Sequence, residues 1–131
     1  MKSMLAPEIY TEKFKETLTF YKDLGFEPQE EAFGFRKMNG FVPLALKNNP
    51  GYVLYVCEAN SSAVSALFHP PFRGEGLILQ VVTDDVESIY CVLHEQGADI
   101  ALPLQDDDGN GRHFAVRDPN GVVVDIAEFN K

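Results

Sequence analysis

The chain has 131 residues, 45% of them hydrophobic and 24% charged, with a formal net charge of −9. This size and balance are typical of one globular domain, and the excess of acid argues against a nucleic-acid partner, which requires clustered Lys and Arg. The sequence contains no apolar run of the ~20 residues that a membrane helix needs, no signal peptide, and only two cysteines, too few for a disulfide framework. We therefore expect a cytoplasmic protein with reduced thiols and no membrane partner.

The elements predicted in chain order form two similar halves. Hydrophobic periodicity predicts one helix among four strands in each half. In the first half these are a strand over 4–10, a helix over 12–24 and strands over 27–37, 41–47 and 52–58. In the second half they are a strand over 76–82, a helix over 84–96 and strands over 99–103, 112–117 and 122–128.

The two halves are internal repeats of one another. Residues 9–28 align with residues 81–100 without gaps at an offset of 72, which matches Gly25 to Gly97, and the final strands align at an offset of 70. Both glycines suit the left-handed position that follows a helix. We therefore expect the whole chain to be a single domain made of two modules and a linker: module one over about 4–58, the linker over 59–75 and module two over about 76–129.

The starts of the two helices carry capping signals. Thr11 is the predicted N-cap of the first helix, and either Thr83 or Asp84 that of the second. Glu87 follows Asp84 by three residues, which is the spacing of a capping box. These signals predict that each helix begins directly after the capping residue.

The segment RDPNGVVVDIAEF, residues 117–129, predicts a turn followed by a strand that carries one acid, Asp125. Its proline and glycine are typical of a hairpin turn. A three-residue loop places Ala115 opposite Asp125, with His113 on the same side of the sheet. The alternate positions form an apolar face toward the helix: Phe114, Val116, Val122, Val124 and Ile126. In module one, the same alternation directs toward the helix Leu44, Leu46, Tyr52, Leu54 and Val56.

Three segments of the chain resemble a known family. They are FYKDLGFEP at 20–28, VTDDVESIY at 82–90 and RHFAVRDPNGVVVDI at 112–126. With the paired modules, they resemble the vicinal oxygen chelate superfamily, which includes glyoxalase I, the extradiol dioxygenases and the bleomycin resistance proteins. The resemblance implies an α+β fold in which two tandem βαβββ modules form a curved mixed sheet. This sheet would be a cup that holds the ligand, with the helices packed outside, and the resemblance also implies a homodimer.

The resemblance also implies where a metal would bind. The metalloenzymes of the family hold their ion on the first and last strands of each module, which correspond here to Ala6, Tyr55, Ile78 and Asp125. Alanine and isoleucine have no donor atom, and one carboxylate makes neither a zinc site nor the oxygen cage of calcium or magnesium. We therefore expect no metal and no other cofactor, and we place the chain nearest the metal-free bleomycin resistance proteins.

Alternation along the strands directs apolar, acidic, amide and imidazole side chains into the expected cup. Such a lining suits an amphipathic ligand, and carboxylates without a metal favour a cationic group. In the linker, Phe68 and Phe72 are candidate lid residues, or alternatively a satellite core cluster or a dimer contact. Cys57 is either a nucleophile or a small buried thiol. The candidate ligand-binding residues are Glu8, Tyr55, Cys57, Phe68, Phe72, Ile78, Gln80, His113 and Asp125.

Two functions are consistent with these residues and with the resemblance. The first is a small-molecule binding protein of the bleomycin-resistance type, which would confer antibiotic resistance by sequestering a ligand in a metal-free cup. The alternative is a glyoxalase (lactoylglutathione lyase)-like lyase or isomerase. It would use a metal held by non-standard ligands or, without a metal, Asp125 or His113 as its base. The missing metal ligands favour the binding protein.

Overall fold

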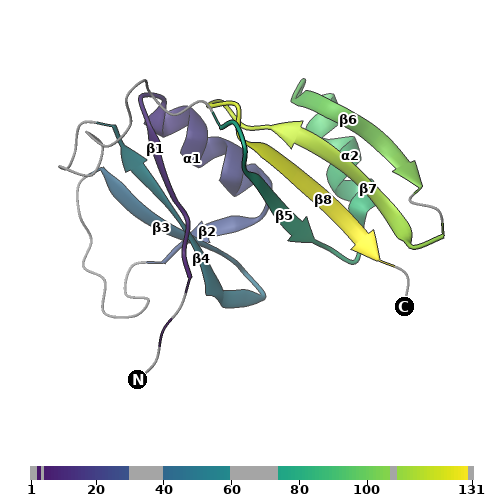
Figure 1. The fold of residues 1–131 in the computed structure, drawn as a ribbon, viewed down its shortest axis with the longest axis horizontal. Coiled ribbons are helices and arrows are strands. Elements are labelled where there is room, and N and C mark those ends of the chain that lie inside the picture. Colours follow the sequence, from purple (N-terminus) through teal and green to yellow (C-terminus); the bar gives the residue numbers. More distant parts are fainter. Residues whose placement is uncertain (1–2, 4, 30–39, 60–73, 107–108, 130–131) are drawn as a thin grey trace. The chain divides into compact units, whose positions relative to one another are not determined.

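The computed structural model describes residues 3, 5–29, 40–59, 74–106 and 109–129 (Figure 1). The chain divides into two compact units, Met1–Phe72 and Arg73–Lys131. In its described part, each unit contains one helix and a four-stranded sheet with both parallel and antiparallel pairs. The predicted α+β class and the two tandem βαβββ modules are therefore confirmed.

The two modules have the same strand order. Module one consists of β1 (Glu8–Thr11), α1 (Phe14–Asp23), β2 (Phe26–Pro28), β3 (Phe41–Leu46) and β4 (Asn49–Glu58), with the sheet order β1-β4-β3-β2. Module two consists of β5 (Ile78–Val82), α2 (Val86–Glu95), β6 (Asp99–Asp106), β7 (Gly111–Arg117) and β8 (Val123–Phe129), with the sheet order β5-β8-β7-β6. In each module the first and last strands pair in parallel, and the other pairs are antiparallel.

The strand register confirms the internal repeat. In module one, Glu8 of β1 lies opposite Tyr55 of β4. In module two, Gln80 of β5 lies opposite Asp125 of β8. These pairs are related by the offsets of 72 and 70 residues that align the two halves of the sequence. Equivalent positions of the repeat therefore occupy equivalent places in the two sheets.

Several predicted boundaries shift in the structure. The first strand begins at Glu8 rather than at residue 4, and β6 continues to Asp106 rather than ending at 103. The strand predicted over 27–37 begins one residue earlier, since β2 is Phe26–Pro28, and residues 30–37 lie outside the described part. Among the described residues, no helix is long and apolar enough to cross a membrane.

The predicted helix ends are confirmed. Gly25 and Gly97 follow the C-caps of α1 and α2 with positive φ angles of 103° and 74°. At the end of α2, the Gly97 N–H donates to the carbonyl of His94 and the Ala98 N–H donates to that of Leu93. This pair of bonds is a Schellman motif, which needs a left-handed residue at the glycine position.

The predicted helix starts are wrong by one or two residues. The N-cap of α2 is Asp85 rather than Thr83 or Asp84, and its carboxylate accepts the N–H and the hydroxyl of Ser88. These hydrogen bonds from Ser88 lower the pKa of the Asp85 carboxyl. Glu87 forms an ion pair with Arg112 rather than a capping box.

The N-cap of α1 is Lys13 rather than Thr11. The Thr11 hydroxyl still binds next to the helix start, because it accepts the Lys13 N–H at 2.8 Å. Thr11 therefore stabilises the turn that leads into α1 instead of capping the helix itself.

The core of module two lies between its sheet and α2 (Figure 1). On α2, Tyr90 packs edge-on against Phe114 of β7, with ring centroids 5.0 Å apart. The register places Ala115 opposite Asp125, as predicted. The predicted apolar face is also confirmed, since none of its five side chains is exposed: Phe114, Val116, Val122, Val124 and Ile126.

The core of module one confirms most of its predicted face and corrects one residue. Leu44, Leu54 and Val56 are buried, but Tyr52 is 74% exposed. The register between β3 and β4 shifts directly after Ala45, so the strict alternation that predicted a buried Tyr52 ends there. A bulge of this kind redirects the side chains beyond it.

Candidate ligand-binding site

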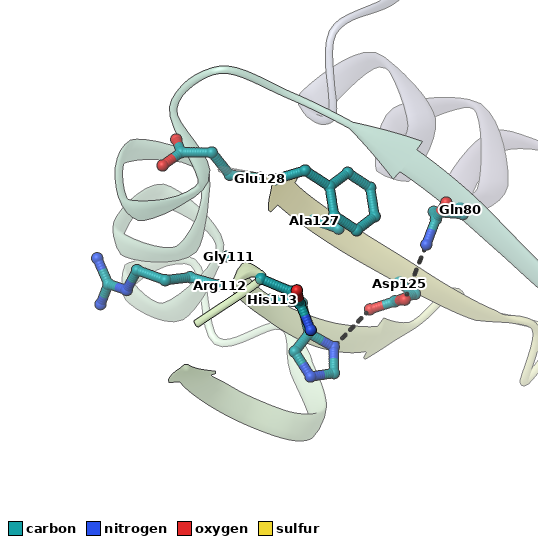
Figure 2. A pocket seen from close by; sticks show the side chains of 9 residues that line it. Gln80, Gly111, Arg112, His113, Asp125, Ala127 and Glu128 are labelled. Atoms are coloured by element: carbon teal, nitrogen blue, oxygen red, sulfur yellow. Dashed lines mark hydrogen bonds and ion pairs between the residues drawn. The ribbon is translucent and has the colours of Figure 1, made fainter. Parts of the chain in front are cut away.

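Three polar side chains meet on the sheet of module two: Gln80 from β5, His113 from β7 and Asp125 from β8 (Figure 2). They lie on the face opposite α2, because the alternate residues of β7 and β8 are buried beneath that helix. The three residues are 12 to 45 positions apart in the sequence. The parallel pairing of β5 with β8 and the hairpin of β7 and β8 bring them together.

Asp125 is the centre of this group. One carboxylate oxygen, Oδ1, lies 3.1 Å from Nδ1 of His113. The other, Oδ2, accepts a hydrogen bond from Nε2 of Gln80 at 3.4 Å. A carboxylate has no proton to give, so Nδ1 of His113 must be the donor. The His113 and Asp125 side chains are 26% and 24% exposed, so a ligand can reach both from solvent.

A pocket of about 100 Å³ opens beside this group. It contains apolar surface from Ala127 and Phe129 as well as the polar centre. Phe129 was not among the predicted ligand residues, although alternation puts it on the same face of the strand as Asp125. The residues that line the pocket are Gln80, Asn110, Gly111, Arg112, His113, Asp125, Ala127, Glu128 and Phe129.

The other charged residues of the pocket are engaged away from its centre. Arg112 forms ion pairs with Glu87 and Asp106, and Glu128 accepts the Val86 N–H at the start of α2. Figure 2 shows Arg112 and Glu128 directed away from the His113–Asp125 contact. Asp125 is therefore the charge that dominates the centre of the pocket.

The equivalent face of module one is a packed cluster rather than an accessible wall. Tyr55 occupies the position equivalent to Asp125 and stacks on Phe41, with ring centroids 4.8 Å apart. Tyr55 and Cys57 are 4% and 0% exposed. Burial raises the pKa of Tyr55, and the nearby Glu8 raises it further. The cluster consists of Tyr10, Ala45, Val53, Tyr55 and Cys57.

Cys57 has the character of a buried thiol rather than a nucleophile. Burial, with a contribution from Glu8, raises its pKa to about 12. The reactive thiolate is therefore scarce at neutral pH. Cys91, in contrast, is exposed on α2.

This difference predicts selective thiol modification. At pH 8, a disulfide reagent should modify Cys91 rapidly and Cys57 only after unfolding, and Cys91→Ser should abolish the rapid phase.

The same burial predicts a loss of stability at high pH. Because the pKa of Cys57 rises from 9.0 to about 12 on folding, the unfolded chain loses the thiol proton at a lower pH than the folded chain. Its contribution to stability should therefore be complete below pH 9 and disappear as the pH rises toward 12. In the modification experiment, rapid reaction of both thiols in the folded protein would contradict the assignment of Cys57 as a buried, unreactive thiol.

Of the remaining predicted ligand residues, two are exposed on strands and two lie outside the described residues. Glu8 is exposed on β1, and Ile78 is 64% exposed on the same face of β5 as Gln80. Phe68 and Phe72, the predicted lid residues, lie outside the described residues.

Comparison with known proteins identifies the family. The family model described as the Glyoxalase/Bleomycin resistance protein/Dioxygenase superfamily matches residues 4–126. The chain belongs to this superfamily. Among curated proteins, no sequence matches it.

Solved structures of this superfamily share its fold. The chain is similar to a family enzyme from Burkholderia phytofirmans PsJN, with a TM-score of 0.77 and 16% identity over 95% of this chain and 97% of that chain. It is also similar to a member from Nocardioides, with a TM-score of 0.71 and 19% identity over 100% and 85% of the two chains. A member from Sphaerobacter thermophilus DSM 20745 gives a TM-score of 0.68 and 19% identity over 98% of each chain.

The residues at the superfamily's metal positions do not fit a metal ion. Ala6 packs against the module-one cluster, Tyr55 is buried within it, and Ile78 is an exposed apolar side chain. In the described ranges, no three His, Cys, Asp or Glu side chains come close enough to hold an ion together. The donor set at Asp125 is therefore one carboxylate, one imidazole and one amide, which falls short of the usual zinc set.

Proposed function

We propose that this superfamily member is a small-molecule binding protein of the bleomycin-resistance type. It would hold an amphipathic ligand in the pocket of module two without a metal ion. The observation that carries the proposal is the convergence of Gln80, His113 and Asp125 beside the apolar surface of Ala127 and Phe129. A few polar groups that converge within apolar walls are typical of sites for small molecules.

The parts of this pocket have separate roles in the proposal. Phe129, which is 50% exposed, supplies a surface for the apolar body of the ligand. Asp125 supplies the polar anchor, and its bonds to Gln80 and His113 hold the carboxylate in one orientation. Because this anchor is oriented before the ligand arrives, little conformational entropy is lost on binding.

A thermal-shift screen tests this function. We expect some aromatic amphiphiles to raise the melting temperature of the wild-type protein, since a ligand of the folded state stabilises it by mass action. Asp125→Ala should remove most of that shift. Asp99→Ala is the matched control, because Asp99 pairs with Arg117 on β6 and β7 outside the pocket. A shift that survives Asp125→Ala, or one divalent metal bound per chain, would disprove the proposal.

A second function is favoured by one specific observation. In the His113–Asp125 pair, Nδ1 of His113 donates to the carboxylate, and in the neutral form of the ring Nε2 is then a proton acceptor. This arrangement would serve a metal-free lyase or isomerase of the glyoxalase type, with His113 as its base. His113→Gln separates the two functions, because it should abolish turnover in an enzyme and leave ligand binding by Asp125 measurable.

A further inference from the structure

The hydrogen bonds around Asp125 define what the centre of the pocket offers to a ligand. A carboxylate has about four acceptor positions, and His113 and Gln80 each occupy one of them. The remaining positions accept hydrogen bonds. When the His113 ring is neutral and donates through Nδ1, it presents an acceptor at Nε2.

Gln80 completes this set. Its Nε2 donates to Asp125, so the amide retains one carbonyl acceptor and one further N–H. With a neutral imidazole, the three side chains therefore offer several acceptors and a single donor. A ligand group that satisfies them must carry several donors itself, and leaving a buried acceptor unsatisfied would reduce its affinity.

The charges near the pocket favour a cation. Arg112 is the only arginine or lysine among the residues that line this pocket, and its guanidinium is paired with Glu87 and Asp106. The Glu128 carboxylate is bound to the start of α2 and adds negative charge nearby. When the His113 ring is neutral, an anion would meet the negative charge of Asp125, whereas a cation would be attracted to it.

We infer that the pocket of module two selects an amidinium or guanidinium group attached to an apolar body. Such a group is planar, positively charged and rich in N–H donors, and it matches the geometry of a carboxylate. The half-exposed ring of Phe129 lines the same pocket and suits both the apolar body and the cation. This inference rests on the proposed function and specifies its ligand class.

Three probes of the same shape test this inference: benzamidine, benzamide and benzoate. They carry a cationic, a neutral and an anionic head group on the same ring. Binding is followed by the NMR signals of Gln80, His113, Asp125 and Phe129 during titration of the full chain. We expect benzamidine to bind about tenfold more tightly than benzamide, which corresponds to the weakest hydrogen bonds that involve a charged group. Benzoate should bind least tightly of the three.

Two variants with the same change of charge make the test specific. Asp125→Asn should weaken benzamidine about tenfold and leave benzamide within about threefold, because the amide keeps the shape and loses the charge. Asp99→Asn removes a carboxylate of the same module that is paired with Arg117 outside the pocket, and it should leave both affinities unchanged. The ring nitrogens of His113 provide a second readout, since their shifts should show a proton on Nδ1.

The outcomes separate this inference from the proposed function. If benzamide or benzoate moves the pocket signals at the same concentration as benzamidine, the ligand class is wrong and the binding function stands. The same holds if Asp125→Asn leaves the affinity for benzamidine unchanged. If none of the probes moves the pocket signals, the inference and the proposed pocket both fail.

Discussion

Replacing Gly111 with alanine should unfold or strongly destabilise module two, by about 3–5 kcal/mol, the range of severe single substitutions. Gly111 begins β7 opposite Phe129 and has a positive φ of 139°. A Cβ there would overlap the backbone oxygen of Glu128 and crowd the Cα of Phe129. Since both obstacles are backbone, the strands must separate to admit the methyl group.

Gly97→Ala is the matched control for this substitution. Gly97 also has a positive φ, 74°, but a Cβ there meets no atom within 4 Å. It should therefore cost only the strain of a left-handed alanine, about 1–2 kcal/mol. Denaturant unfolding measures the difference, and hydrogen exchange in β7 and β8 locates it. If the two variants lose equal amounts of stability, the close approach of the strands at Gly111 adds nothing to the cost of the substitution.

Replacing Asp118 with alanine should destabilise the β7–β8 hairpin by about 2–4 kcal/mol, since two hydrogen bonds to a charged group are lost. Asp118 is 5% exposed, and its carboxylate accepts hydrogen bonds from the N–H groups of Asn120 and Val122 at 2.8 and 2.9 Å. Val122 is fully buried. Without the carboxylate, the buried Val122 N–H would lose this acceptor, and water could not replace it.

Two controls accompany this substitution. Asp118→Asn keeps a side-chain oxygen and should lose roughly half as much stability. Asp99→Ala removes an exposed ion pair with Arg117 and should cost about 0–1 kcal/mol. Because the hairpin carries both His113 and Asp125, Asp118→Ala should also weaken ligand binding. An unfolding free energy within 1 kcal/mol of the wild type would contradict the role of this turn.

The orientation of Asp125 was predictable because it depends on local rules. The D-P-N-G segment forms the expected three-residue loop: the Asp118 N–H bonds the Val122 carbonyl, and Gly121 has a φ of 90°. Such a loop fixes the hairpin register, and a strand alternates its side chains with a period of two. Asp125 and Ala115 therefore had to share the face opposite the helix, and the register confirms this.

Two other predictions from local rules failed, one based on strand alternation and one on helix capping. Tyr52 lies beyond the register shift after Ala45 and is exposed. Asp85 rather than Asp84 caps α2, because several neighbouring polar residues can each cap a helix and only the backbone path selects one. Asp84 and Asp85 are adjacent acids, so composition could not distinguish them.

The sequence by itself determined the repeated βαβββ order, the family resemblance, and the face on which Gln80, His113 and Asp125 lie, since periodicity and turn chemistry are local. Only the tertiary structure decided that Gln80 and His113 both contact Asp125, because the parallel pairing of β5 with β8 joins residues 45 positions apart. It also decided that Tyr55 is buried while Asp125 is accessible, although the repeat makes them equivalent. Burial depends on what covers each sheet, and no pattern within a single strand encodes that.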